Sequence, residues 1–171
     1  MDTDVKKRRS CRLCDSKEVK VVIPLEKIPL TEKYLSEDEL NTPVETYPID
    51  VYMCLTCGCV QLLDVINPKI LWDDFTFRSG QAPIIVDHMD EVASKTCEEY
   101  AIPKGSLVID VGSNDGTFLN CFKNNGMTVL GVDPAKEIAQ EANKAGINTI
   151  PDFLTKKLAK KITQEHGKAA L

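Results

Sequence analysis

The stretch "LVIDVGSNDGTFL", from Leu107 to Leu119, decides the fold of the second half of the chain. An apolar run carrying one carboxylate, Asp110, leads into a turn rich in glycine and small polar residues. The chain then resumes with apolar residues at helical spacing. Strand, tight turn and helix in this order are typical of the first unit of a parallel α/β domain.

The alternation of strand and helix continues after this stretch. Strands are expected at residues 107–111, 128–132 and 148–150, and helices at residues 117–124, 135–145 and 155–165. Strands that alternate with helices predict parallel βαβ units with right-handed crossovers. The fold class expected for residues 105–171 is therefore α/β, with a parallel sheet.

The residues before this domain follow a different pattern. Residues 1–74 hold short apolar runs separated by prolines, which predicts a small irregular subdomain with too little core to fold unaided. Residues 75–104 are expected to be a linking loop and a helix, the helix starting near Ile84. The chain is thus divided into residues 1–74, 75–104 and 105–171.

Composition and charge exclude several kinds of partner. The chain has 171 residues and a formal net charge of −5, which argues against nucleic acid as a partner. No apolar run approaches the roughly 18 residues of a membrane helix, and no leader is recognised, so a cytoplasmic protein that binds no membrane is expected. The basic run Lys6-Lys7-Arg8-Arg9 is interpreted as a solvated tail, with a localisation or phosphate-binding patch as the alternative.

Seven cysteines in a chain without a signal peptide favour metal binding or free thiols over a disulfide framework. Cys11 and Cys14 form one Cys-x-x-Cys pair, and Cys54 and Cys57 form another. Two such pairs can hold one tetrahedral ion, and Zn²⁺ suits four thiolates. The predicted role of the zinc is structural, because four protein ligands leave no open position. Two unrelated thiol pairs, or a redox motif, are the alternatives.

The other three cysteines have different expected roles. Cys59 follows the second pair closely and is interpreted as a bystander. Cys97 and Cys121 lie on expected helical faces, where a free cysteine packs as a small apolar residue.

The turn Gly112-Ser113-Asn114-Asp115-Gly116 departs from the pattern that binds a pyrophosphate. That pattern needs a glycine where this chain has Asn114, and a carboxylate at the start of the helix, Asp115, repels phosphate. Asp110, at the end of the strand, suits an ammonium group. A ligand with an amino acid at one end and a nucleoside at the other fits these features, which predicts S-adenosylmethionine as the cofactor.

Two further carboxylates follow the next strands. Asp133, in "VLGVDP", is placed to accept the ribose hydroxyls, and Asp152, in "TIPDF", to meet the adenine amino group. The predicted cofactor-binding set is Asp110, Gly112, Ser113, Asn114, Gly116, Asp133 and Asp152. NAD, or a Rossmann-like unit without a ligand, remains an alternative.

The motifs together resemble the sugar C-methyltransferases of deoxysugar pathways. The resemblance is carried by "CRLC", "YPIDVYMCLTCGCVQL", "SGQAPIIVDHM", "VIDVGSNDGTFL", "GVDP" and "GINTIPDF". It implies a zinc-binding domain followed by half of a Rossmann-like class I methyltransferase domain. It also implies zinc at the four paired cysteines, S-adenosylmethionine as cofactor and a nucleotide-linked sugar as substrate.

The resemblance draws in residues 75–88, which in the family lie over the cofactor and the sugar. The family often has tyrosines where this chain has Phe75 and Phe77, so any role of those hydroxyls is lost. Ser79 and His88 match the family pattern. For His88 we favour a role in packing or capping the helix over a role in the site.

The family continues beyond the position of Leu171, with further strands and with the histidine and glutamate that act as acid and base. We therefore expect a fragment, with no catalytic residue assigned. Strand 107–111 would be left at an open edge, which predicts self-association or completion in trans. Two classes of function remain: the cofactor-binding part of a C-methyltransferase, and a non-catalytic zinc-bearing module that binds a sugar nucleotide or a protein.

Overall fold

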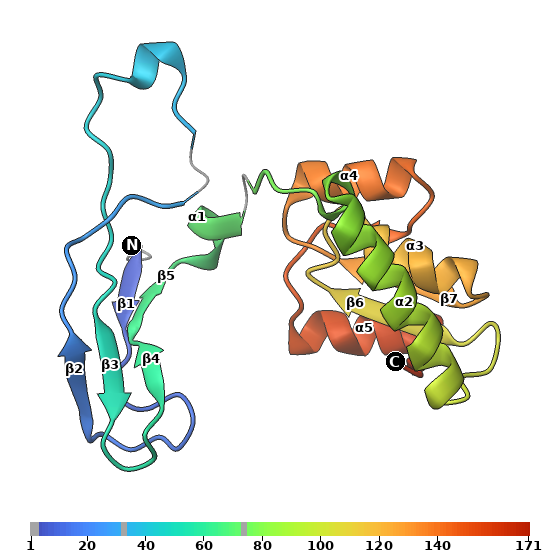
Figure 1. Cartoon of the computed structure of the whole chain (residues 1–171), viewed down its shortest axis with the longest axis horizontal. Helices are drawn as coiled ribbons and strands as arrows, with labels where there is room; N and C mark the ends of the chain where they lie inside the picture. The colour runs from blue at the N-terminus through green and yellow to red at the C-terminus, as the bar shows by residue number, and fades with distance from the viewer. Residues whose placement is uncertain (1–3, 32–33, 73–74) are drawn as a thin grey trace. The chain divides into compact units, whose positions relative to one another are not determined.

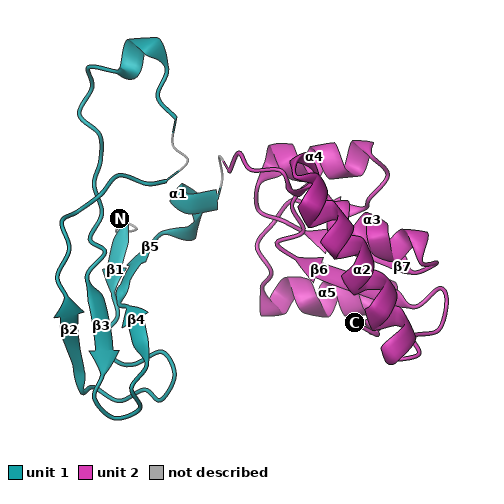
Figure 2. Cartoon of the chain, viewed as in Figure 1, with its two compact units in different colours: residues 1–74 teal, residues 75–171 magenta. Residues whose placement is uncertain are grey.

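The computed structural model describes residues 4–31, 34–72 and 75–171 (Figure 1). The chain divides into two compact units, residues 1–74 and residues 75–171 (Figure 2). The segment at 75–104 therefore lies in the second unit, where its helix α2 (Pro83–Glu99) packs against α3 (Thr117–Asn124). The two units are described one at a time.

The first unit is built from short antiparallel strands. One sheet has the order β2-β3-β4, and a second pairs β1 with β5. The elements are β1 (Val5–Lys7), β2 (Val19–Ile23), β3 (Val51–Cys54), β4 (Val60–Leu62), β5 (Asp64–Ile66), the 3-10 turn η1 (Glu37–Glu39) and the helix α1 (Pro68–Trp72). Few of its described side chains are buried: Cys11, Tyr47, Tyr52, Cys54, Gln61 and Leu63. So small a core supplies little folding energy by itself.

The interpretation of the basic run as a solvated tail is wrong. Val5–Lys7 forms β1, which pairs antiparallel with β5. The Lys7 ammonium lies 3.6 Å from the Asp64 carboxylate and 5.1 Å from the centre of the Tyr52 ring. Arg8 donates hydrogen bonds to two backbone carbonyls at the first cysteine loop. The partners of the run are distant in sequence, so no local pattern reveals them.

The second unit has a parallel sheet with the strand order β6-β7-β8, which confirms the α/β fold class. Its elements after α2 are β6 (Leu107–Val111), α3, β7 (Thr128–Val132), α4 (Lys136–Lys144), β8 (Thr149–Ile150) and α5 (Lys156–His166), with the 3-10 turn η2 (Ser79–Gln81) before α2. Their bounds agree with the expected ranges to within one residue at each end, because strong hydrophobic patterns and clear turn residues delimit each element.

Helices cover both faces of this sheet. Because successive strand residues point to opposite faces, Val108 and Leu107 enter different cores. On one face α2, α3 and α4 pack around Ala93, Val108, Leu119, Cys121, Phe122, Met127, Ala142 and Ile147. On the other face α5 packs, with Ile162 meeting Leu107, Leu130 and Val132. The glycine turn and Asp133 follow the carboxyl ends of β6 and β7, the end of a parallel sheet at which ligands bind.

The helix α2 is amphipathic. It buries Ala93 and partly buries Met89 and Cys97, while Ile84 is 79% exposed. Cys97 and Cys121 both belong to this core, as expected. In the part of the chain that the structure describes, no helix has the length and hydropathy that crossing a membrane requires.

The edge of β6 that faces away from β7 meets the last residues of the chain. The Ala170 N–H donates to the Leu107 carbonyl at 2.8 Å, and the Ile109 N–H donates to the Leu171 carbonyl at 3.0 Å. The segment after α5 therefore returns to the sheet beside β6. This finding corrects the expectation of a wholly open edge, while self-association along it stays a prediction.

Candidate metal centre and cofactor-binding turn

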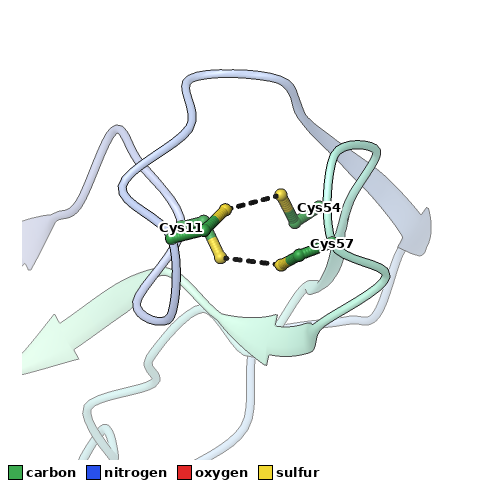
Figure 3. Close-up of side chains that lie close together, drawn as sticks. Cys11, Cys54 and Cys57 are labelled. Atoms are coloured by element: carbon green, nitrogen blue, oxygen red, sulfur yellow. Dashed lines mark hydrogen bonds between the residues drawn. The ribbon is translucent and has the colours of Figure 1, made fainter.

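The four paired cysteines converge on one point. Cys11 and Cys14 come from the loop before β2, and Cys54 and Cys57 from the turn that ends β3. The sulfurs of Cys11 and Cys57 are 3.7 Å apart, as are those of Cys14 and Cys54, and all four lie within 4.8 Å of one another. Figure 3 shows Cys11, Cys54 and Cys57 pointing toward one another from two loops. Two unrelated thiol pairs are thereby ruled out.

These distances fit a zinc ion. Zn–S bonds of about 2.3 Å in a tetrahedron separate the sulfurs by about 3.8 Å. The four cysteines therefore already stand at zinc-binding separations and can hold Zn²⁺. With four sulfur ligands, the centre would have no open coordination position.

Backbone hydrogen bonds shape the second cysteine loop. The Gly58 N–H donates to the Cys54 carbonyl at 2.9 Å, and the Cys54 N–H donates to the Cys59 carbonyl at 2.9 Å. Gly58 has a φ of +74°, which glycine adopts without strain. This tight turn brings Cys57 back toward Cys54, while Cys59 is left outside the described four-cysteine cluster.

Hydrogen bonds favour the thiolate form of two of the cysteines. The pKa of Cys11 is lowered to about 6, first by the Gln61 side-chain amide and then by the Cys14 N–H. The pKa of Cys54 is also lowered, with the Cys57 N–H as the largest cause. Since the thiolate is the form that binds metal, these hydrogen bonds favour metal binding at Cys11 and Cys54, whereas burial and the neighbouring sulfurs raise the pKa of Cys14 and Cys57.

In the second unit, the turn after β6 is held by left-handed backbone conformations. Gly112 has a φ of +81°, Asn114 of +52° and Gly116 of +80°. The Gly112 N–H donates to the Val132 carbonyl at 2.8 Å. Asparagine is among the few residues that adopt such a φ readily, which explains how Asn114 stands where a glycine is usual.

The Asp133 carboxylate fixes this turn from the end of β7. It is 7% exposed, and its Oδ2 accepts the Asn114 backbone N–H at 2.8 Å. Its Oδ1 accepts the Ala135 N–H at 2.8 Å, next to the start of α4. Each oxygen keeps a further acceptor position. Contact of Asp133 with ribose hydroxyls stays a prediction. The structure shows a further role of this carboxylate, which is to hold the turn through hydrogen bonds.

The side chains of the turn hold a second segment, residues 77–80, which we call the docked segment. Asn114 Oδ1 accepts the Ser79 N–H at 3.0 Å, and Asn114 Nδ2 donates to the Phe77 carbonyl at 2.9 Å. Asp115 Oδ2 accepts the Gly80 N–H at 2.9 Å. Sequence reasoning missed this contact, although an asparagine in a glycine position offers both a donor and an acceptor to a nearby backbone.

The docked segment is also tied to α4. Arg78 makes a bidentate pair with Glu141, with N···O distances of 2.8 and 3.0 Å. This pairing lowers the pKa of Glu141. Arg78 and Glu141 are 63 residues apart, so the pair gave no signal in the sequence.

The side chains singled out near the docked segment differ in exposure. Phe77 is 43% exposed, and Phe75 is half-buried. His88 is exposed in the body of α2, away from either helix end, so the expected packing or capping role is wrong.

Asp110 lies half-buried near the carboxyl end of β6, opposite Gly131 of β7. Burial raises the pKa of its carboxyl, and the charge of Asp133 raises it further. A nearby cation would relieve both effects. Asp110 thus has the surroundings expected of a carboxylate that receives an ammonium group.

The remaining predicted residues take different positions. Ser113 is buried, and among the described residues its hydroxyl has no hydrogen-bond partner. It packs so close to Gly131 that a Cβ there would lie 2.4 Å from Ser113 Oγ. Asp152 is exposed two residues after β8. The predicted set therefore gathers at the carboxyl ends of the three strands.

Comparisons with known proteins agree with this arrangement. Residues 11–72 match the family model described as "Putative zinc binding domain". The chain is 32% identical to the C-methyltransferase NovU of Streptomyces niveus over 161 residues. The matched residues make up 94% of this chain and 38% of the relative. The chain thus spans somewhat more than a third of that relative's length.

The chain thus joins a unit that matches a zinc-binding family model to an α/β unit with an acidic glycine turn. The match to the zinc-binding model and the similarity to a C-methyltransferase agree with the family that the motifs resemble.

The first prediction concerns the metal. Cys54→Ser removes one of four ligands, and we expect the chain to lose zinc and residues 4–72 to unfold, because the metal replaces a core in this unit. Residues 75–171 should stay folded on their own core. Zinc content by mass spectrometry and backbone amide spectra measure both effects. Cys59→Ser is the control and should retain one zinc; full zinc retention in Cys54→Ser would contradict the assignment.

The second prediction concerns the docked segment. A Cβ at Gly80 would lie 2.8 Å from Thr117 Oγ1 and 3.1 Å from Asp115 Oδ2, so Gly80→Ala should push the segment off the turn. Each lost hydrogen bond is worth about 1 kcal/mol, so the amides of residues 79 and 80 should each exchange with solvent about fivefold faster. Hydrogen-exchange spectra measure this rate. Gln81→Ala should leave it unchanged, and equal rates in both variants would disprove the docking.

The third prediction concerns Asp110. A carboxyl whose pKa is raised by folding destabilises the fold when ionised, so Asp110→Asn should raise the free energy of unfolding at pH 7. The gain should shrink as the pH falls through the raised pKa and vanish below the ordinary pKa of about 3.9. Urea unfolding at several pH values tests this. The exposed Asp152→Asn control should change stability by less than about 0.5 kcal/mol.

Proposed function

We propose that this chain is the cofactor-binding part of an S-adenosylmethionine-dependent methyltransferase. The observation that carries the proposal is the acidity of the site. Asp110 is a half-buried carboxyl whose pKa is raised by burial and by Asp133, so a cationic group on the ligand is favoured there. Asp115 adds a second carboxylate beside the turn, which disfavours the pyrophosphate of NAD.

The proposed roles follow the order of the strands. Asp110 receives the ammonium group, Asp133 the ribose hydroxyls and Asp152 the adenine amino group. Gly112 supports this placement, because no atom lies within 4 Å of the place that a Cβ would take, so the backbone is open to a ligand. When bound, S-adenosylmethionine supplies an electrophilic methyl group.

We propose C-methylation of a nucleotide-linked deoxy or keto sugar as the reaction. The family resemblance supports this substrate, and the relative from Streptomyces niveus is itself a C-methyltransferase. A carbon nucleophile forms when a base removes the proton beside a keto group, and none of the described residues is assigned as that base. The zinc is proposed to be structural, since its four ligands are all cysteines.

The fourth prediction tests the cofactor by calorimetric titration of the zinc-loaded chain. S-adenosylhomocysteine should bind, and NAD should not. Methylthioadenosine, which keeps the nucleoside but lacks the amino acid, should bind more weakly. If neither S-adenosylhomocysteine nor methylthioadenosine binds while NAD does, the acidic turn has been misinterpreted. If none of the three binds, a zinc-bearing binding module becomes the better description of the chain.

A variant makes the titration specific to one contact. Asp110→Asn should weaken S-adenosylhomocysteine binding by about 1.5–3 kcal/mol, the worth of a hydrogen bond to a charged group, and leave methylthioadenosine binding unchanged. Equal losses for both ligands would contradict the ammonium assignment and point to a disturbed fold. Asp133 is a less suitable site for this test, because its carboxylate also braces the turn.

A further inference from the structure

One polar side chain of the first unit points at the metal cluster without being a ligand. Gln61 lies in β4 and is 9% exposed. Its amide nitrogen, Nε2, is 3.2 Å from the sulfur of Cys11. A buried amide beside a sulfur is a costly arrangement unless its donors and acceptor are satisfied.

The contacts of Gln61 fix which end of the amide meets the sulfur. Its Oε1 accepts the Arg12 backbone N–H at 2.8 Å, which only an oxygen can do. Its Nε2 also lies 3.3 Å from the Cys59 carbonyl, which only a donor can satisfy. A flipped amide would face the Arg12 N–H with a donor and the Cys59 carbonyl with an acceptor. The nitrogen therefore faces the sulfur.

The sulfur that receives this hydrogen bond is one of the two fully buried sulfurs of the cluster. Cys11 is fully buried, and the Leu13 backbone N–H also lies 3.3 Å from its sulfur. A Zn²⁺ ion with four thiolates carries two net negative charges. Burying such a charge is unfavourable unless donors surround the sulfurs, and solvent cannot reach this one.

We propose that Gln61 is a positioning residue of the metal centre, which holds the Cys11 thiolate in place and stabilises it through an N–H···S hydrogen bond. The same amide ties three parts together: the first cysteine loop through Arg12, the second through the Cys59 carbonyl, and the sulfur itself. The inference concerns the zinc-binding unit alone and does not depend on the proposed cofactor.

The chain offers a matched control for this role. The hydroxyls of Ser16 and Thr56 hydrogen bond at 2.8 Å and join the regions of the same two cysteine pairs, but this contact does not involve sulfur. Both it and the Gln61 contact span the first and second loops. Thr56→Val removes a link of the same kind while leaving the sulfurs untouched.

The fifth prediction compares Gln61→Met, Gln61→Glu and Thr56→Val in the whole zinc-loaded chain. Loss of the partner that orients a metal ligand typically costs about 10–100-fold in metal affinity. We expect Gln61→Met to release zinc to a colorimetric chelator at least about tenfold faster. Gln61→Glu should be as fast or faster, because it keeps the acceptor for Arg12 but offers an acceptor to the thiolate. Thr56→Val should release zinc at the unmodified rate.

Cobalt substitution gives a second measurement that unfolding alone would not mimic. An N–H···S bond stabilises the sulfur lone pair, so its loss should shift the sulfur-to-cobalt charge-transfer band of Gln61→Glu to lower energy while the tetrahedral ligand-field bands remain. Should Gln61→Met fail to fold, Gln61→Glu still carries the test. Unchanged zinc release together with an unshifted band in Gln61→Glu would overturn the proposal and leave Gln61 as a contact for Arg12 only.

Discussion

The second unit depends on one buried carboxylate. Asp133 accepts the Asn114 backbone N–H with one oxygen and the Ala135 N–H with the other, and so joins the ends of β6 and β7. With its backbone held, Asn114 presents its side-chain amide to the docked segment. One carboxylate therefore orders the turn directly and the docked segment indirectly. Removing it would leave two buried N–H groups without acceptors, the costly case for a hydrogen bond.

The first unit is held together by a different principle. Its strands are short, and the few described side chains that are buried include two of the cysteines themselves. A unit of this kind gains little from burial, so ligand bonds to a metal supply the folding energy instead. The sulfurs stand at separations that fit zinc, and a backbone and a side-chain N–H group meet the buried sulfur of Cys11. A zinc ion held by the four cysteines would thus take the place of a core in this unit.

The proposed cofactor site depends on where the strands place its carboxyl groups and on the charge interactions between those groups. Asp110 is placed by a regular strand near Asp133, and both carboxyls lie where strands β6 and β7 end. A carboxylate that is half-buried beside another carboxylate lowers the stability of the fold when it is ionised, and the same surroundings favour a bound cation. The Asn114 amide and one oxygen of Asp115 hydrogen bond to the docked segment, and the other Asp115 oxygen accepts from Thr117. Among the described residues, no side-chain hydrogen bond of this kind is seen for Asp110, whose carboxyl we propose for the ammonium group.

The sequence by itself determined the regular elements of the α/β unit, because apolar periodicity and glycine turns act locally. It also identified the four metal-binding cysteines, since the spacing of each pair is a local property. Only the tertiary structure revealed strand β1 in the basic run, the Arg78–Glu141 pair, the second role of Asn114 and the contact of Gln61 with Cys11. These interactions join residues far apart in the chain. Tertiary packing brings these residue pairs together, and local sequence patterns therefore do not predict them.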